Sequence, residues 1–239
     1  MNSLGKTIDG KLMYPTMYGD EGWYNYTPAK YTYNALELYY LSMKAEDRRR
    51  LPTSGWIAYL DGKNPGYPVQ ALRADLTRIR ERAAAMRLDT TTPDTRLADD
   101  PMKYNPASVE SLIELMLGGV HPRHNGAPIH CRVRYFDPAK RRAGIPEGVA
   151  ALVQRLSTDE LTLTLVNTDQ LHERDVILQA GGYGEHQFAS ATTAGKTVPV
   201  DARDLTVRLA PGAGAQLVLT MKRYANTPTL RFPWDIVRP

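Results

Sequence analysis

The spacing of apolar residues predicts one long amphipathic helix in the first half of the chain, over roughly residues 67–88. Its apolar positions recur at steps of three and four, which places them on one helical face. These positions are Leu72, Leu76, Ile79, Ala83 and Met86. Arg73, Arg80 and Arg87 fall seven apart, so we expect them to line the outer side of this helix.

Three further helices are predicted from apolar patterns and end signals. The first runs over residues 28–51, where Thr27 is the expected N-cap and Pro28 the first helical residue. The second runs over residues 106–118, after Asn105 and before a glycine pair. A short helix is expected over residues 146–156, where valine and leucine recur at helical spacing.

The period of the pattern changes to two from about residue 160, which predicts β-strands. In LTLTLVN, the leucines at 161, 163 and 165 alternate with threonines. Short runs at similar spacing follow, each bounded by turn residues, and HCRVRYF at 130–136 adds another candidate strand. The later runs are ERDVILQAG, GEHQFAS, KTVPV, DLTVRLA and AQLVLTMKR. Many short strands in succession favour an antiparallel β-sandwich, with the proline-rich tail extended along its outside.

The fold class expected is therefore α+β, with an N-terminal irregular and helical region followed by an antiparallel β-sandwich. Composition supports this order, because ten of the fourteen tyrosines lie at or before Tyr67. We assign residues 1–120 to an aromatic-rich helical region and residues 121–239 to the sandwich, its short helix and the tail.

Composition narrows the class of protein. With 239 residues, 42% hydrophobic and 23% charged, the chain has the composition of a globular protein. The net charge of +4 is small, and the basic runs at 47–50 and 139–142 lie at helix ends or on solvated faces, which does not favour nucleic-acid binding. The single cysteine, Cys131, excludes an intrachain disulfide, and we expect it to be a small buried residue.

We find neither a membrane-span pattern nor a signal-peptide pattern in this sequence. No apolar run is long enough for a membrane span, and the N-terminal residues do not read as a signal peptide. The cellular location is therefore left open, and the protein would be periplasmic or secreted if a leader or upstream region is missing from this sequence.

The stretch YGDEGWYNYTPAKYTYN, residues 18–34, holds five tyrosines and a tryptophan. Tyrosine and tryptophan stack on sugar rings while their polar groups bond to hydroxyls, so Trp23, Tyr24 and Tyr26 are candidates for a carbohydrate site. Tyr24 and Tyr26 are also candidate proton donors or acceptors. The polar partners expected for such a site are Asp20, Glu21, Asn25 and Lys30. The alternative is that the aromatic residues only pack, which we favour for the tyrosines of the following helix.

Other ionisable groups are explained more simply as structural. His121, His124 and His130 lie close in sequence, yet no ligand set is complete around them, so no metal site is assigned and the question stays open. Glu185 and His186 are neighbours in a predicted strand and would point to opposite faces unless a bulge intervenes. Asp169, His172 and Glu173 fall in a predicted hairpin turn. No phosphate loop, serine elbow or cofactor motif is present, so no cofactor is expected.

Two stretches resemble known polysaccharide-processing proteins. GDEGWYNYTPAKYTYNALELYYLSM is similar to a segment of heparinase-type and oligoalginate-type lyases, where a tyrosine-rich turn enters an α/α toroid. LTLTLVNTDQLHERDVILQAGGYGEHQF and VRLAPGAGAQLVLTMKR resemble the C-terminal β-sandwiches of such bacterial proteins. In this resemblance Tyr24 or Tyr26 matches the tyrosine-bearing turn. A complete toroid needs many more helices, so the resemblance implies the C-terminal part of a larger protein or a subunit that completes one.

Two functions follow as hypotheses. The first is the C-terminal part or a subunit of a lyase-like or glycosidase-like carbohydrate-processing protein, which binds sugar through the N-terminal aromatic residues and works with a larger helical partner chain or as a homo-oligomer. The second is a non-catalytic accessory subunit that completes a partner chain through its aromatic helical face.

Overall fold

The computed structural model describes residues 2–29, 35–52, 54–92, 94–95, 105–107, 110–120 and 128–236. The chain divides into two compact units, Met1–Pro52 and Thr53–Pro239. The change from helices to strands expected near residue 120 therefore lies inside the second unit. Helices and antiparallel sheets are both present, so the α+β fold class is confirmed. None of the helices in the described ranges is long and apolar enough to cross a membrane.

The first unit begins with an antiparallel sheet rather than the irregular segment expected. A short 3-10 helix, η1 (Asn2–Leu4), precedes the sheet, whose strand order is β1-β2-β3. Its strands are β1 (Lys6–Ile8), β2 (Lys11–Gly19) and β3 (Gly22–Thr27). Asp9 and Gly10 join the first pair, both with positive φ, at 49° and 74°. Two such residues fit a type I′ hairpin turn, which makes Asp-Gly the local signal for this sheet.

The helical part of this unit starts later than the sequence suggested. Thr27 is paired with Tyr14 in the sheet, so it ends a strand instead of capping a helix. The backbone bends at Pro28 and Ala29, and the described helices are α1 (Ala35–Ser42) and α2 (Ala45–Arg48). The predicted helix start at Thr27-Pro28 is therefore wrong. The Thr27 hydroxyl still accepts a hydrogen bond from the Ala29 N–H at 3.3 Å, but in a bend that follows the strand and not at a helix start.

The described elements at the start of the second unit include the helices α3 (Gly55–Leu60), α4 (Tyr67–Leu88) and α6 (Glu110–Leu117). Helix α4 has the predicted bounds. Helix α3 was not predicted, and it is capped by the Ser54 hydroxyl, which accepts a hydrogen bond from the Ile57 N–H. Helix α6 ends before the glycine pair as expected, but residues 105–107 are not helical. The Asn105 side chain instead accepts a hydrogen bond from the Ala107 N–H, forming a local turn.

The β-sandwich consists of a five-stranded sheet, ordered β10-β9-β12-β7-β6, and a four-stranded sheet, ordered β11-β8-β4-β5. The five-stranded sheet contains β6 (Val149–Leu156), β7 (Glu160–Asn167), β9 (Gln187–Thr193), β10 (Lys196–Ala202) and β12 (Gly214–Lys222). The other contains β4 (Val133–Asp137), β5 (Arg142–Ala143), β8 (Arg174–Ala180) and β11 (Asp204–Leu209). Most of the strands predicted from alternation are thereby confirmed, and the tail contains the short 3-10 helix η2 (Pro233–Asp235).

The helix predicted over residues 146–156 is wrong, because this segment forms strand β6. Its apolar residues fit both the helical period of 3.6 residues and the strand period of two, and pairing with β7 selects the strand. Val149 pairs with Asn167 and Val153 with Leu163, so both valines face the buried interior. Gly148, with φ of 76°, turns the chain into the strand.

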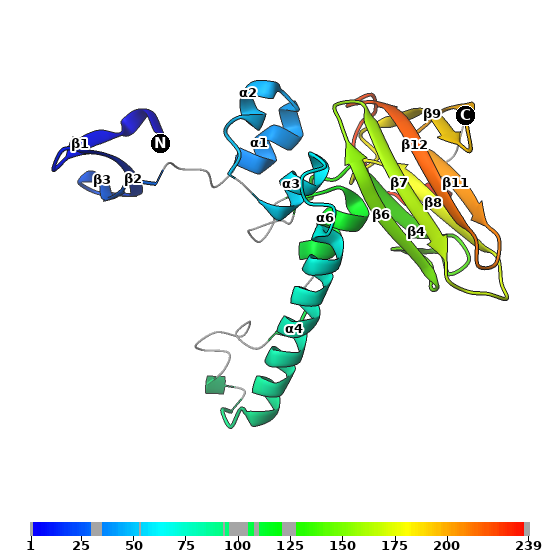
Figure 1. The fold of residues 1–239 in the computed structure, drawn as a ribbon, viewed down its shortest axis with the longest axis horizontal. Helices are drawn as coiled ribbons and strands as arrows, with labels where there is room; N and C mark the ends of the chain where they lie inside the picture. Colours follow the sequence, from blue (N-terminus) through cyan, green and yellow to red (C-terminus); the bar gives the residue numbers. More distant parts are fainter. Residues whose placement is uncertain are drawn as a thin grey trace. The chain divides into compact units, whose positions relative to one another are not determined.

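The core lies between the two sheets. Fully buried leucines, valines and aromatic residues from both sheets fill it, as the period of two requires. They include Val133, Tyr135, Leu161, Leu163, Leu165, Val176, Leu178, Phe188 and Leu219. Helix α6 packs on β6 and β4 (Figure 1). The Tyr135 hydroxyl donates to the Met116 carbonyl, which fixes the helix to the sandwich.

Gly119 allows the end of α6 to approach the strand region closely. A Cβ at this position would lie 2.8 Å from Cys131 Cβ and 2.9 Å from the His130 carbonyl oxygen. We therefore expect Gly119→Ala to lower the free energy of unfolding by about 1–3 kcal/mol, because packed backbone must move. Urea denaturation would measure this. Gly214→Ala is the matched control, since its Cβ meets nothing nearer than 3.5 Å; equal losses in both variants would contradict the explanation.

Candidate functional site

The sequence-predicted site residues lie on the β2–β3 hairpin of the first unit. Asp20 and Glu21 form the turn between paired Gly19 and Gly22. Trp23 lies opposite Tyr18, and their rings meet edge to face with centroids 5.0 Å apart. Both rings are exposed, so this end of the hairpin presents an aromatic surface next to two carboxylates.

Tyr24 and Tyr26 lie further along the same strand. Tyr24 is exposed and its ring covers Gly19, whereas the Tyr26 ring lies under the Lys6 ammonium, 4.0 Å from the ring centroid. Lys6 therefore makes a cation–π contact with the ring face. Asn25 has a φ of 55°, and its carbonyl oxygen accepts a hydrogen bond from the Thr16 hydroxyl. Lys30 lies outside the described residues.

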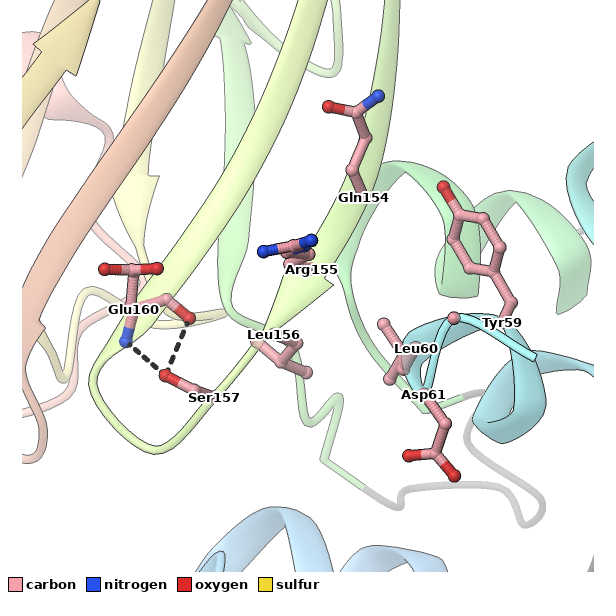
Figure 2. A pocket seen from close by; sticks show the side chains of 9 residues that line it. Tyr59, Leu60, Asp61, Gln154, Arg155, Leu156, Ser157 and Glu160 are labelled. Atoms are coloured by element: carbon pink, nitrogen blue, oxygen red, sulfur yellow. Dashed lines mark hydrogen bonds between the residues drawn. The ribbon is translucent and has the colours of Figure 1, made fainter. Parts of the chain in front are cut away.

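A second candidate site, which the sequence did not reveal, is a cleft in the second unit with a volume of about 430 Å³. It lies between the end of α3 and the β6–β7 hairpin. Figure 2 shows Tyr59 and Asp61 on the helical side and Gln154, Arg155 and Glu160 on the strand side. The other lining residues are Leu60, Gly62, Leu156 and Ser157.

The helical wall of the cleft is fixed by aromatic packing. Tyr59 stacks on Trp56, with centroids 5.8 Å apart and planes 27° apart, and Trp56 itself is only 1% exposed. Burial raises the pKa of the Tyr59 hydroxyl, so this group is neutral at physiological pH and can both donate and accept hydrogen bonds. Lys63 pairs with Asp61, with Nζ 3.5 Å from the carboxylate.

The strand wall is shaped by an irregularity in pairing. The register of β6 against β7 shifts between Val153 and Arg155, which leaves Gln154 as an extra residue. The Gln154 side-chain oxygen accepts hydrogen bonds from the Thr164 hydroxyl at 3.0 Å and the Gln216 amide at 2.6 Å. The Ser157 hydroxyl accepts a hydrogen bond from the Glu160 N–H in the hairpin turn, as Figure 2 shows, while the Arg155 and Glu160 side chains are exposed.

A cluster of acidic side chains lies between α4 and α6. The Tyr67 hydroxyl donates to the Glu114 carboxylate, joining α4 to α6. Burial raises the pKa of Glu114, and burial together with Glu114 raises that of Tyr67. Asp75 is buried nearby and lies 3.6 Å from Arg78, which also approaches Glu110 at 3.5 Å. The helical pattern had assigned only apolar residues to the inner face of α4, so Asp75 was missed.

The side chains of Glu185 and His186 lie close together in the interior, contrary to the expectation that they point to opposite faces. Both precede β9 in a loop, and the Glu185 carboxylate lies 3.7 Å from His186 Nε2. His186 is buried beside Arg132, and its Nδ1 accepts a hydrogen bond from the Tyr224 N–H. Burial, with smaller effects from Arg132 and Arg223, lowers the pKa of His186 to about 4, so the ring is neutral at physiological pH.

The remaining candidates are structural. Asp169 and His172 lie in a turn, where the N–H of Leu171 and other donors lower the pKa of Asp169 to about 2. Cys131 is buried, and burial raises the pKa of its thiol to about 12, which confirms the expected buried residue. His121 and His124 lie outside the described residues. Within the ranges that the structure describes, no three histidine, cysteine, aspartate or glutamate side chains gather as a metal site.

The fold and the two candidate sites thus define an α+β protein in which helices pack on a β-sandwich and a polar cleft lies between them. The model of a protein family described as a domain of unknown function (DUF8034) matches residues 52–113, which include α3 and α4. Comparison with curated proteins gave no match. No solved structure matches either.

Proposed function

We propose that this chain is part of a carbohydrate-processing protein and that it binds an oligosaccharide in the cleft between α3 and the β6–β7 hairpin. The observation that carries the proposal is the set of groups in this cleft. An aromatic ring, two carboxylates, an amide and a guanidinium line a space of about 430 Å³. This volume falls within the range of small-molecule sites.

Each group has a role in recognising a sugar. The rigidly held Tyr59 offers an apolar ring and a neutral hydroxyl. Asp61 and Glu160 can accept hydrogen bonds from sugar hydroxyls, and Gln154 can donate through its amide. Arg155 supplies a planar donor that matches a carboxylate, so a uronate-containing sugar is the ligand that uses the whole set.

The β2–β3 hairpin is a second sugar-contacting surface in this proposal. Trp23 with Tyr18 provides an exposed aromatic surface, and Asp20 and Glu21 lie at its end. In the catalytic form of the proposal, Tyr24 or Tyr26 exchanges a proton during β-elimination next to a uronate. A larger helical partner would complete that active site. The accessory-subunit function remains the alternative, and the exposed aromatic residues of the hairpin support it equally.

Calorimetric titration of the full chain with a short oligouronate tests the cleft. We expect Arg155→Ala to weaken oligouronate binding by about tenfold or more, because a charge-assisted hydrogen bond is lost. A neutral cello-oligosaccharide of equal length should be affected little, whereas Tyr59→Phe should weaken binding of both sugars. Arg231→Ala is the control, since Arg231 is an exposed arginine that does not line the cleft. If Trp23→Ala abolished binding and the cleft variants did not, the hairpin and not the cleft would be the site.

A further inference from the structure

Helix α4 carries a heptad pattern of apolar residues, most of which are exposed. The apolar positions follow steps of three and four over the whole helix, which is the spacing of the a and d positions of a coiled coil. They are Val69, Leu72, Leu76, Ile79, Ala83 and Met86, here called the α4 stripe. At about 1.5 Å per residue the stripe is about 26 Å long, enough for a helix–helix contact.

The structure buries a different side of this helix. Its buried residues are Ala71 and Asp75, and Arg82 donates to the Asn105 carbonyl on the same side. By contrast, Val69 is 55%, Leu72 40%, Leu76 50% and Met86 48% exposed, while Ile79 and Ala83 are half-buried. Figure 1 shows α4 extending from the region where α3 and α6 meet the sandwich. A regular apolar stripe with this exposure is the surface of a helix that packs against another chain.

The charges beside the α4 stripe indicate which charges a partner helix would carry. Arg73, Arg80 and Arg87 occupy the e position of three successive heptads, and all three side chains are exposed. Residues at e and g set partner choice in coiled coils. Three arginines in one row attract a partner helix with acidic residues along its edge and repel one with basic residues.

A second copy of this chain fits less well. In an antiparallel pair the two rows of arginines would face each other. In a parallel pair, Arg87 of one copy would lie opposite Arg82 of the other, and Arg80 would lie opposite Asp75. Asp75 is already buried within its own unit, 3.6 Å from Arg78. Like charges in these positions are destabilising, so a different chain is favoured.

We propose that the α4 stripe docks an amphipathic helix of a partner protein whose flanking positions are acidic. The contact is a two-helix coiled coil, in which leucine-like residues of the partner cover Leu72 and Leu76. Acidic side chains of the partner pair with Arg73, Arg80 and Arg87. This inference is independent of sugar binding, because no residue of the stripe or its arginine row lines the cleft.

Two synthetic peptides of about four heptads test the proposal, both with leucine at a and d, one with glutamate and the other with lysine at e and g. We expect the full chain to bind the glutamate peptide about tenfold or more tightly than the lysine peptide, measured by fluorescence anisotropy. The triple variant Arg73→Glu, Arg80→Glu, Arg87→Glu should reverse this preference, and Leu72→Ser with Leu76→Ser should abolish binding of both. All of these positions are exposed, and circular dichroism would verify that each variant folds.

Three outcomes would overturn the proposal. Equal binding of both peptides would show that the arginine row does not select a partner. Binding of neither peptide would show that other residues of the chain cover the stripe. A concentration-dependent dimer, seen by sedimentation and lost in the Leu72→Ser, Leu76→Ser variant, would identify a second copy as the occupant.

Discussion

Replacement of Trp56 by alanine is expected to lower the free energy of unfolding of the second unit by about 3–5 kcal/mol. Trp56 is 1% exposed, and its ring lies against Tyr59 and Tyr67, with centroid distances of 5.8 and 6.5 Å. Removing it leaves a cavity that the short helix α3 cannot fill without moving. Because Tyr59 loses the surface on which it stacks, the cleft should lose sugar affinity as well.

Chemical denaturation followed by circular dichroism would measure the stability loss, and titration with the oligouronate would measure the second effect. Trp23→Ala is the matched control, since Trp23 is 38% exposed and lies in the other unit. A small loss, within about 1 kcal/mol, is expected there. If both tryptophan variants lost the same stability, the aromatic packing beneath the cleft would not be the structural support that we describe.

His186 is expected to make the fold sensitive to acid. Its pKa is about 4 in the folded chain and near 6.5 when exposed, so in this interval the unfolded chain binds a proton that the folded chain does not. The contribution of His186 to stability should therefore be full above about pH 6.5 and fall by about 3 kcal/mol as the pH drops to about 4. The physical reason is that a charged ring would be buried beside Arg132.

The pH dependence of urea midpoints measures this effect, and His186→Asn isolates it. Asparagine offers a side-chain oxygen where His186 Nδ1 accepts from the Tyr224 N–H, yet it does not titrate. The variant should be less stable at neutral pH but should lose less stability between pH 6.5 and 4. Parallel profiles for the wild type and His186→Asn would contradict the explanation.

The residues show why some elements could be predicted from the sequence. The long helix and the strand LTLTLVN have one clear period each, and the structure forms both elements, although the helix buries a different side from its apolar one. The segment 146–156 has apolar residues that satisfy two periods, and only its pairing with β7 selects the strand. Strand β7 follows β6 after a short turn, but it lies outside the segment 146–156, so the pattern within that segment could not decide between helix and strand. The Asp9-Gly10 turn, in contrast, was a readable signal for the N-terminal sheet.

The candidate site was less predictable than the fold. The aromatic hairpin was identified by its composition, and the structure places Trp23 and Tyr18 together there. The cleft joins Tyr59 to Gln154 and Arg155, which are separated by nearly a hundred residues, and no motif links them. The stacking of Tyr59 on Trp56 and the irregular pairing at Gln154 create it, and both depend on tertiary packing.

The position of β12 has a consequence for how the protein is made. It is the last described strand along the chain, yet it lies between β7 and β9 in the middle of the five-stranded sheet. During synthesis, β7 and β9 leave the ribosome before the strand that joins them, and each then has an unpaired edge. Such edges invite wrong pairing with other nascent chains. The five-stranded sheet can be completed only after residues 214–222 have emerged, so its earlier strands must wait for the last one.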